Sequence, residues 1–249
     1  MSQRLSRAVA ELLPARVVGA AVRAVYPRVE PELRRLHEFV SQGGTAVDVG
    51  GWFGPWTARL LRRADHVVTV EADPGLAALL AKTFPAARVI AAAASDRDGV
   101  ATLYSPPTGP LVGVSTLERA EGVASTVKTI TLDALNLSDV RFLKIDIEGH
   151  ELPALRGAAR TIQRDHPVIL LELETRHQPV DAVTTLLDSW GYSGQILTDD
   201  GWQSLSGFDL ASHQEAQAAQ LTRSFPSRVL FPGTRYLNSV LFRHHSWAR

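Results

Sequence analysis

A dense set of ionisable side chains occupies residues 140–158, VRFLKIDIEGHELPALRGA. Lys144, Asp146 and Glu148 stand at alternate positions of a predicted strand, so their side chains share one side of it. His150 comes two residues later, and an imidazole, with an unperturbed pKa of about 6.5, can take a proton from a reacting group. We therefore predict His150 as a general base, with the other three as catalytic residues. In the alternative, His150 only caps the next helix or pairs with Glu148.

A second acidic pair ends the next predicted strand. The run PVILLELET places Glu172 and Glu174 two residues apart, facing one way. Because neighbouring parallel strands lie about 4.8 Å apart, these two side chains can converge with Asp146 on one ion. Carboxylate oxygens are ligands that suit magnesium, so Asp146, Glu172 and Glu174 are predicted to hold Mg²⁺ or a similar ion. In the alternative, either glutamate pairs with Lys144 or Arg176 without a metal.

A glycine-rich turn follows the first predicted strand, in TAVDVGGWFGPWT at residues 45–57. Gly50, Gly51 and Gly54 let the backbone turn sharply and approach a ligand closely. A helix begins just after them, so its N-terminus points at that ligand. The spacing is not that of the dinucleotide fingerprint G-x-G-x-x-G. Asp48, just before the loop, would repel a pyrophosphate but suits a cationic amino group, such as that at the methionine end of S-adenosylmethionine.

The next two predicted strands also end in polar residues. HVVTVEADP carries Glu71 about 20 residues after Gly50, the distance at which an acid accepts hydrogen bonds from a ribose diol. Ser95 and Asp96 follow the third strand, where a polar pair can contact an adenine amino group. A strand-end acid alone is often only solvated, but this order of motifs favours a nucleoside site. The predicted cofactor-binding residues are Asp48, Gly50, Gly51, Gly54, Glu71, Ala72, Ser95, Asp96 and Asp146.

These residues need a sheet to hold them. From residue 45 onward, short β-rich runs alternate with helical runs, which is typical of an α/β protein with a mostly parallel sheet and helices on both faces. The predicted strands are 45–49, 66–70, 88–91, 141–145, 167–171, 193–197 and 238–243. The predicted helices are 56–63, 75–83, 152–163 and 180–190, and two further β-like runs lie at 100–104 and 127–131.

Two regions lie outside this alternation. Residues 1–42 mix apolar and charged positions at helical spacing and are predicted to be an N-terminal helical extension of a domain formed by residues 43–249. Residues 198–237 are a long insertion before the last strand. Connections of this length are usually functional or have structure of their own, so we expect a lid or a substrate-binding insertion, with a packed surface excursion as the alternative. Its aromatic residues are Trp202, Phe208, Phe225, Phe231 and Tyr236.

The amino-acid composition of the chain argues against several classes of function. The 26 basic and 26 acidic side chains balance, so nothing in the total favours a nucleic-acid or anionic-lipid partner. The absence of cysteine excludes disulfides, thiolate metal sites and cysteine nucleophiles. No apolar run approaches the roughly 20 residues that cross a bilayer, so we expect a cytoplasmic protein without stable membrane insertion. Further histidines lack partner spacing and are predicted to be surface or packing residues: His37, His66, His166, His177 and His213.

Five blocks in this order, DVGGWFG, VEADP, AAASD, KIDIEGHELPALRGA and PVILLELE, resemble the FkbM family of S-adenosylmethionine-dependent methyltransferases. The resemblance covers residues 45–197 and implies a Rossmann-like seven-stranded methyltransferase sheet, mostly parallel with an antiparallel last strand. The pair Gly51 and Trp52 departs from the family, which usually has a small residue and asparagine there. The resemblance places Asp48, Gly50, Gly54, Glu71 and Asp96 at the cofactor, and Asp146, Glu148 and Glu151 in an acidic block.

The resemblance also implies a function. Family members are mostly O-methyltransferases of sugars and natural products, so we expect domain 43–249 to use S-adenosylmethionine, with Mg²⁺ as a second cofactor, to methylate a hydroxyl of a sugar, oligosaccharide or polysaccharide precursor. An acceptor hydroxyl must lose its proton, which a base or a metal assists. The alternatives are an N- or O-methyltransferase of a lipid, peptide or natural product, and an inactive nucleoside-binding scaffold. The N-terminal helices are candidates for pairing two subunits in a homodimer.

Overall fold

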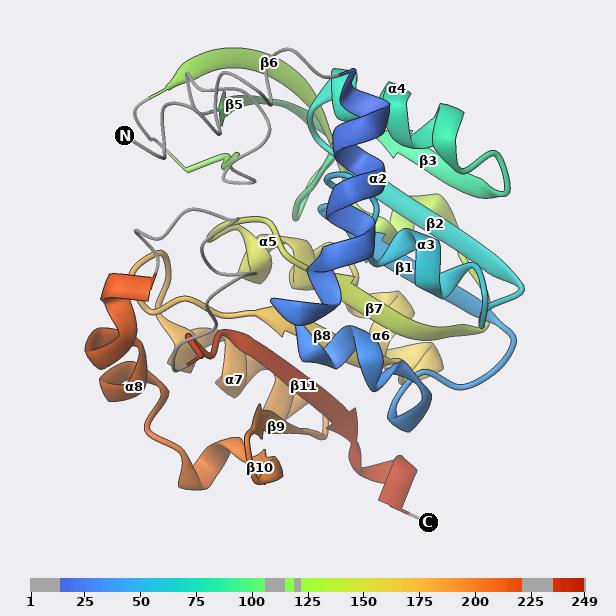
Figure 1. The fold of residues 1–249 in the computed structure, drawn as a ribbon. Helices are drawn as coiled ribbons and strands as arrows, with labels where there is room; N and C mark the ends of the chain where they lie inside the picture. Colours follow the sequence, from blue (N-terminus) through green and yellow to red (C-terminus); the bar gives the residue numbers. More distant parts are fainter. Residues whose placement is uncertain (1–13, 106–114, 119–121, 221–234, 249) are drawn as a thin grey trace.

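An eight-stranded sheet forms the centre of the computed structural model, which describes residues 14–105, 115–118, 122–220 and 235–248 (Figure 1). The strands are β1 (Thr45–Val49), β2 (His66–Glu71), β3 (Ala87–Ala91), β7 (Val140–Ile145), β8 (Val168–Glu172), β9 (Tyr192–Thr198), β10 (Gly201–Ser204) and β11 (Ser239–His244). They lie side by side in the order β10-β9-β11-β8-β7-β1-β2-β3. The first strand, β1, is therefore flanked by β2 and β7, two strands that end in predicted site residues.

The directions of the strands match the predicted class. β1, β2, β3, β7 and β8 run parallel, whereas β11 runs antiparallel to both of its neighbours, β8 and β9. The prediction of a mostly parallel α/β sheet with an antiparallel last strand is confirmed. All seven predicted strands are present, and an eighth, β10, pairs antiparallel with β9. A turn at Asp199 and Asp200 reverses the chain between these two strands.

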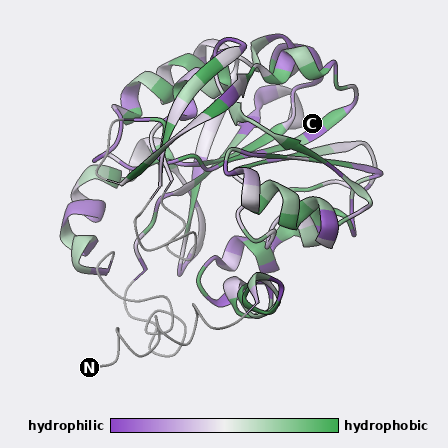
Figure 2. Ribbon diagram, turned by 90° about the horizontal axis from the view of Figure 1, so that it is seen from above, coloured by the Kyte–Doolittle hydropathy of each residue, from purple (hydrophilic) through white to green (hydrophobic). Residues whose placement is uncertain are grey.

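Helices cover both faces of the sheet (Figure 2). They include α3 (Thr57–Leu60), α4 (Pro74–Thr83), α5 (Glu151–Arg156), α6 (Ala159–Asp165), α7 (Val180–Ser189) and the 3₁₀ helix η5 (Leu132–Leu135). A further 3₁₀ helix, η8 (His245–Ala248), follows β11, and its residues 245–247 are exposed. Successive side chains of a strand point to opposite faces. Val47 and Leu143 accordingly join a core with α5, α6 and α7, whereas Ala46 and Phe142 join a second core with α3. The predicted site residues lie where these strands end, between the two layers.

The N-terminal segment, residues 15–38, is only partly the helical extension that the sequence predicts. It holds one α-helix, α2 (Ala15–Val25), followed by the 3₁₀ helices η1 (Tyr26–Arg28), η2 (Pro31–Arg34) and η3 (Leu36–Glu38). Pro27 and Pro31 lack the N–H that a continuous α-helix needs, so the chain breaks into short turns there. Leu33 and Leu36 pack into the core on the α3 face. The segment thus crosses the front of the domain and is packed onto it (Figure 1).

The helix predicted over residues 152–163 is two helices, α5 and α6. They are separated at Gly157 and Ala158. A Cβ on Gly157 would lie 1.9 Å from the backbone oxygen of Ser95. The chain must therefore come close to Ser95 at this point, and a small residue that breaks the helix allows it. The prediction of one continuous helix is wrong for this reason.

A second, three-stranded sheet follows β3. Its strands are β4 (Ala93–Ala94), β5 (Gly99–Ser105) and β6 (Val123–Ile130), in the order β4-β6-β5. The two β-like runs that flank the predicted loop are β5 and β6, and they pair antiparallel along their whole length. This sheet extends from the carboxyl end of β3, next to the predicted nucleoside residues.

The insertion at residues 198–237 has structure of its own. Besides β10 it holds η6 (Leu205–Gly207), α8 (Leu210–Gln217) and η7 (Ala218–Gln220), while Phe225 and Phe231 lie outside the described residues. Gln214 of α8 is buried: its Nε2 donates to the backbone oxygens of Leu173 and Leu237, and its Oε1 accepts from the backbone N–H and the hydroxyl of Thr175. These bonds fasten α8 to the loop after β8.

Trp202 lies in β10, the edge strand of the sheet, which β9 and β11 separate from β8. Its Nε1 donates a hydrogen bond of 2.8 Å to Glu38, and its ring packs edge-on against Phe39 at 5.8 Å. Within the described residues, no helix combines the length and the apolar character that a membrane span requires.

Candidate active site

The glycine loop between β1 and α3 is shaped by packing inside the protein. Gly50 and Gly54 have left-handed φ angles of 81° and 76°. A Cβ on Gly50 would lie 1.9 Å from the backbone oxygen of Asp146, and one on Gly54 would lie 2.3 Å from Cε2 of Phe84. Gly51 packs in the same way against β2. Contacts within the protein therefore account for these glycines without a ligand, and they bring the loop against the end of β7.

Asp48 is buried at the end of β1 and belongs to an internal polar network. Its Oδ2 accepts a hydrogen bond of 2.6 Å from the hydroxyl of Thr57, and its Oδ1 lies 4.0 Å from Nζ of Lys144. Burial raises the pKa of Asp48, and the Lys144 ammonium opposes this rise. The cation beside Asp48 is thus a lysine of the protein. A direct contact between Asp48 and a cofactor stays a prediction.

Glu71 ties the glycine loop to the end of β2. Its Oε2 accepts a hydrogen bond of 2.8 Å from the backbone N–H of Trp52, and its Oε1 accepts one of 2.9 Å from that of Asp73. The first bond holds Trp52 at a left-handed φ of 47°, which is uncommon for a non-glycine residue. Burial raises the pKa of Glu71 to about 7. Each carboxylate oxygen of Glu71 keeps a further lone pair, which can accept a hydrogen bond from a ribose diol. The next residue, Ala72, packs against the second sheet.

His150 lies beside the residues predicted to contact adenine. Its Nε2 is 3.0 Å from Oγ of Ser95, and its Nδ1 is 3.2 Å from Oε1 of Glu118. Ser95 Oγ is in turn 3.5 Å from Asp96. His150 stands at the N-cap position of α5, but its imidazole makes no capping hydrogen bond there and pairs with Glu118 instead of Glu148. His150 therefore lies on the side where the nucleoside is predicted to bind, and its role as a base stays a prediction.

Lys144 and Asp146 form a buried ion pair at the end of β7. Nζ lies 2.8 Å from Oδ2, and the Lys144 side chain is 6% exposed. Burial disfavours both charges. Even so, Asp146 and Asp48 raise the pKa of Lys144, and the Lys144 ammonium lowers the pKa of Asp146. Both groups are ionised at neutral pH, so Lys144 is a fixed positive charge rather than a proton donor.

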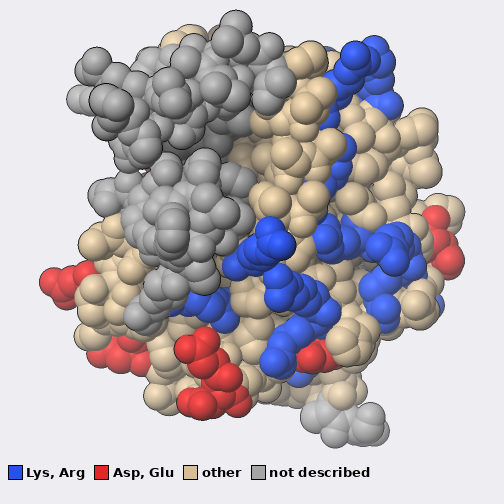
Figure 3. Space-filling view, viewed as in Figure 1, with Lys and Arg blue, Asp and Glu red and all other residues tan. Residues whose placement is uncertain are grey.

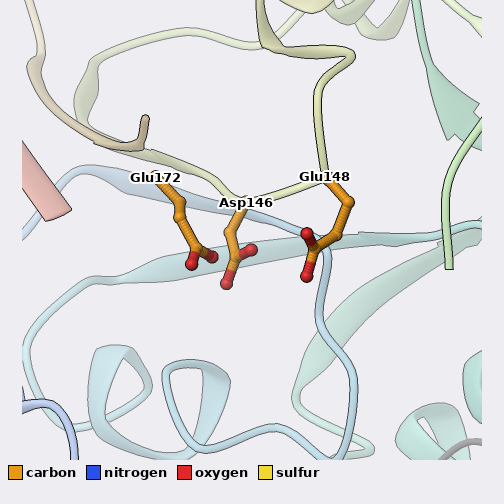
Figure 4. Close-up of side chains that lie close together, drawn as sticks. All are labelled: Asp146, Glu148 and Glu172. Atoms are coloured by element: carbon orange, nitrogen blue, oxygen red, sulfur yellow. The ribbon is translucent and has the colours of Figure 1, made fainter. Parts of the chain in front are cut away.

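Three carboxylates converge at the carboxyl ends of β7 and β8. Oxygen atoms of Asp146, Glu148 and Glu172 all lie within 4.8 Å of one another, and the side chains point the same way (Figure 4). Burial and the Asp146 charge raise the pKa of Glu172 well above its usual range. Burial and the charges of Asp146 and Glu174 raise the pKa of Glu148 to about 8. These crowded hard-oxygen donors fit a divalent cation such as Mg²⁺. We call them the carboxylate group.

The backbone of the loop after β7 sets the position of Glu148. Glu148 and Gly149 have left-handed φ angles of 53° and 97°. The hydroxyl of Thr116 donates a hydrogen bond of 2.7 Å to the backbone oxygen of Glu148. The buried carboxylate of Glu151 accepts hydrogen bonds from the backbone N–H groups of Ile147 and Gly149. Glu151 thus holds the loop in place.

Glu174, which the predicted metal site includes, has other partners. It pairs with Arg176, and Nδ2 of Asn238 lies 3.3 Å from its Oε1. This ion pair corresponds to the metal-free alternative for this glutamate. In the described part of the chain, the carboxylate group contains Glu148 and not Glu174.

His177 lies against the carboxylates, although its sequence position suggests only a surface or packing residue. Its Nε2 is 3.5 Å from Oε2 of Glu148 and 3.6 Å from Oε2 of Glu174. Burial and the Arg176 charge lower its pKa, so the imidazole is neutral at pH 7 and can accept a proton. The prediction of a surface or packing residue misses the contact with Glu148, because Glu148 lies far away in sequence. One signal in the sequence does point to it: His177 follows Glu174 by three residues in the same loop.

Two tyrosines from opposite ends of the chain border the site. The hydroxyl of Tyr26 in η1 donates a hydrogen bond of 2.8 Å to Oε1 of Glu30. Tyr236, near the end of the insertion, has its pKa raised to about 12 by burial and the Glu174 charge. No role for Tyr26 or Glu30 could be predicted from the sequence, since the pattern of the N-terminal segment indicates only helix.

The fold and the site together define a class of protein. A parallel sheet with β1 between β2 and β7, a glycine loop after β1, an acid at the end of β2 and polar side chains at the end of β7 form the Rossmann-like fold of S-adenosylmethionine-dependent methyltransferases. Residues 47–193 match the family described as the methyltransferase FkbM domain. The match spans more than half of the 249 residues, and the chain belongs to the FkbM family.

Solved structures of low sequence identity are similar to this chain. A methyltransferase FkbM from Methylobacillus flagellatus is 16% identical with a TM-score of 0.49, over 82% of this chain and 44% of that one. The chain thus spans less than half of that protein's length. A TehB-like SAM-dependent methyltransferase from Corynebacterium glutamicum is 15% identical with a TM-score of 0.42, over 71% and 81% of the two chains. A Streptococcus mutans protein in complex with SAH is 9% identical with a TM-score of 0.46, over 86% and 96%. Among curated proteins, none matches.

Proposed function

We propose that this FkbM-family enzyme is an O-methyltransferase that moves the methyl group of S-adenosylmethionine to a hydroxyl of a sugar or oligosaccharide, a polysaccharide precursor included. The observation that carries the proposal is the convergence of Asp146, Glu148 and Glu172 within 4.8 Å at the carboxyl ends of neighbouring strands. In open parallel sheets, ligands bind outside these strand ends. The acceptor therefore meets a set of oxygen atoms that accept hydrogen bonds.

The chemistry of the carboxylate group suits a polyhydroxyl acceptor. Adjacent hydroxyls of a saccharide can each donate to a different carboxylate, and such charge-assisted hydrogen bonds are stronger than those between neutral groups. Holding an acceptor in line with a reacting carbon can by itself lower the barrier by several kcal/mol. The half-buried phenol of Tyr236 adds an aromatic surface beside Glu174, where a sugar ring can pack.

A divalent cation, with Mg²⁺ as the first candidate, is part of the same proposal. Asp146, Glu148 and Glu172 would hold it, because they are the hard-oxygen donors that lie together. When bound, the cation supplies positive charge that favours the deprotonated acceptor. The fixed charge of Lys144, 2.8 Å from Asp146, keeps that carboxylate ionised and ready to act as a ligand.

Two histidines are candidates for taking the acceptor proton. The sequence favours His150, whose imidazole lies between Ser95 and Glu118. The geometry favours His177, whose Nε2 faces the carboxylates of Glu148 and Glu174. A base must lie within reach of the proton that it removes, so His177 is the stronger candidate for an acceptor bound at the carboxylate group.

The test is a transfer assay with methyl-labelled S-adenosylmethionine, offered to mono- and oligosaccharides, to a lipid and to an amine, each with and without EDTA. We expect label in the saccharide as a stable ether. Label only in the amine or lipid would overturn the choice of acceptor. Binding of the cofactor without transfer to any acceptor would support the inactive scaffold instead.

A further inference from the structure

The N-terminal segment lies outside the family match at residues 47–193, yet it covers the glycine loop. Val22 of α2 packs with Phe53 and Leu76, and Nη1 of Arg23 donates a hydrogen bond of 3.0 Å to the backbone oxygen of Phe53. The α2 helix runs along the front of the domain over this region (Figure 1). Figure 3 shows several basic side chains on the same face. The segment that follows α2 is thereby fixed in place beside the site.

Tyr26 lies between the glycine loop and the carboxylate group. Its ring centroid is 5.5 Å from that of Trp52, the loop residue bonded to Glu71. Burial raises the pKa of Tyr26 most, and the charges of Glu30, Asp146 and Glu172 raise it further. Tyr26 thus packs on the partner of the predicted ribose acid, and its phenol lies in the electrostatic field of the carboxylate group.

Two neutral donors hold the carboxylate of Glu30, and the charge of Lys144 lowers its pKa without fully offsetting its burial. Its Oε1 accepts from the Tyr26 hydroxyl at 2.8 Å, and its Oε2 accepts from Nε1 of Trp56 at 2.7 Å. No lysine or arginine forms an ion pair with it among the described residues; the nearby Lys144 is paired with Asp146. Burial raises the pKa of Glu30 to about 7, so an additional positive charge at this point would be stabilising.

The order of the strand ends indicates what that charge is. A nucleoside held by Glu71 at the end of β2 and by Ser95 beyond β3 lies over one half of the sheet. The sulfonium must face the carboxyl end of β7, where the carboxylate group receives the acceptor. The remaining part of the cofactor, its amino-acid end, then extends past the glycine loop toward α3. Glu30, bonded to Trp56 just before α3, lies on that side.

We propose that Glu30 and Tyr26 form the binding site for the amino-acid end of S-adenosylmethionine, with the Glu30 carboxylate accepting hydrogen bonds from the α-ammonium group. Tyr26 positions this carboxylate through its hydroxyl. Asp48, which the sequence suggests for the ammonium, already faces Lys144. The inference goes beyond the proposed acceptor, because it concerns only the methyl donor and holds whichever group is methylated.

The test compares two ligands by calorimetry: S-adenosylhomocysteine, and 5′-methylthioadenosine, which has the same nucleoside and thioether but no amino-acid end. We expect Glu30→Gln to weaken S-adenosylhomocysteine binding about tenfold or more, as for loss of a charge-assisted hydrogen bond. Binding of 5′-methylthioadenosine should not change. Tyr26→Phe, which keeps the ring against Trp52, should show the same selectivity to a smaller degree.

Glu32→Gln is the matched control, since Glu32 is a buried carboxylate of the same segment that pairs with Arg235 instead. Glu32→Gln should not weaken the binding of one ligand more than the binding of the other. Equal weakening of both ligands by Glu30→Gln would show that Glu30 only supports the loop, and unchanged binding of both would place the ammonium elsewhere; either result overturns the proposal. Thermal unfolding of each variant separates these outcomes from a failure to fold, and Tyr26→Phe still tests the site if Glu30→Gln does not fold.

Discussion

The ammonium of Lys144 lies 2.8 Å from Oδ2 of Asp146 and 4.0 Å from Oδ1 of Asp48. Two carboxylates at the ends of neighbouring strands thus share one buried cation. Asp146 belongs to the carboxylate group, and Asp48 is buried below the glycine loop. Lys144 therefore connects the stability of the sheet to the charge of the active site.

Replacement of Lys144 by methionine should lower the free energy of unfolding by about 3–5 kcal/mol, because it leaves two buried carboxylates without their cation. Urea denaturation measures this loss. The double variant Lys144→Met with Asp48→Asn should recover part of it, since one of the two uncompensated charges is then gone. A loss below about 1 kcal/mol in the single variant would contradict this account.

Removal of the divalent cation should abolish transfer. We expect EDTA to stop the reaction and Mg²⁺ to restore it, and Glu172→Gln to weaken Mg²⁺ binding at least about tenfold in calorimetry, through loss of a charged ligand. Glu174→Gln is the control, because Glu174 is paired with Arg176 and should leave Mg²⁺ binding nearly unchanged. Full activity in EDTA would eliminate the metal and leave the carboxylate group as a direct acceptor site.

The two histidines should have different kinetic effects. His177→Ala should lower kcat about a hundredfold while leaving the affinity for S-adenosylhomocysteine unchanged, because its imidazole faces the carboxylate group. His150→Ala should instead weaken the binding of S-adenosylhomocysteine, since His150 contacts Ser95 where the nucleoside is predicted to bind. The reverse pattern, with the kcat effect on His150, would restore the base that the sequence favours.

Asp133 should make stability depend on pH. Its carboxylate accepts hydrogen bonds from the backbone N–H groups of Arg160 and Thr161 and from the Thr161 hydroxyl, at the start of α6. Burial opposes the charge, but these bonds outweigh it and lower the pKa. Asp133→Ala should cost about 1–2 kcal/mol near pH 7.

Because the folded-state pKa of Asp133 lies below the unfolded value of about 3.9, its contribution is complete above that value and is lost as the pH falls through the folded pKa. The difference between wild type and Asp133→Ala, measured by denaturation at several pH values, should therefore shrink on acidification below about pH 4. Asp139→Asn, which removes one charge of an exposed ion pair with Arg141 and tolerates the left-handed φ of 49° at this position, should give a small difference at every pH. A constant difference for Asp133→Ala would exclude the charge as its cause.

The strands could be predicted from the sequence because each is a short apolar run bounded by polar or glycine residues. All seven appear within a residue or two of their predicted ends, and the order of glycine loop, Glu71 and carboxylates follows from the connectivity of a parallel sheet. The convergence of Asp146 and Glu172 follows from the same geometry, since β7 and β8 are neighbours.

The site residues that could not be predicted from the sequence are those whose contact partners lie far away along the chain. His177 faces Glu148 across two loops, and Glu30 reaches Trp56 from a segment whose pattern shows only helical spacing. Contacts between residues so far apart leave no periodic pattern in the sequence around either residue. The break between α5 and α6 was hidden for a similar reason, because the neighbour that requires Gly157 is Ser95, more than sixty positions earlier.

The hydrogen bonds of Gln214 have a consequence for exchanging parts between family members. They join α8 of the insertion to Thr175, in the loop that also carries Glu174 and His177. A chimera that received a foreign insertion without a glutamine at this point would leave the backbone of Thr175 unanchored and would release the histidine from the carboxylates. The insertion and the loop after β8 are thus coupled, and we expect a replacement of the insertion alone to displace His177 as well.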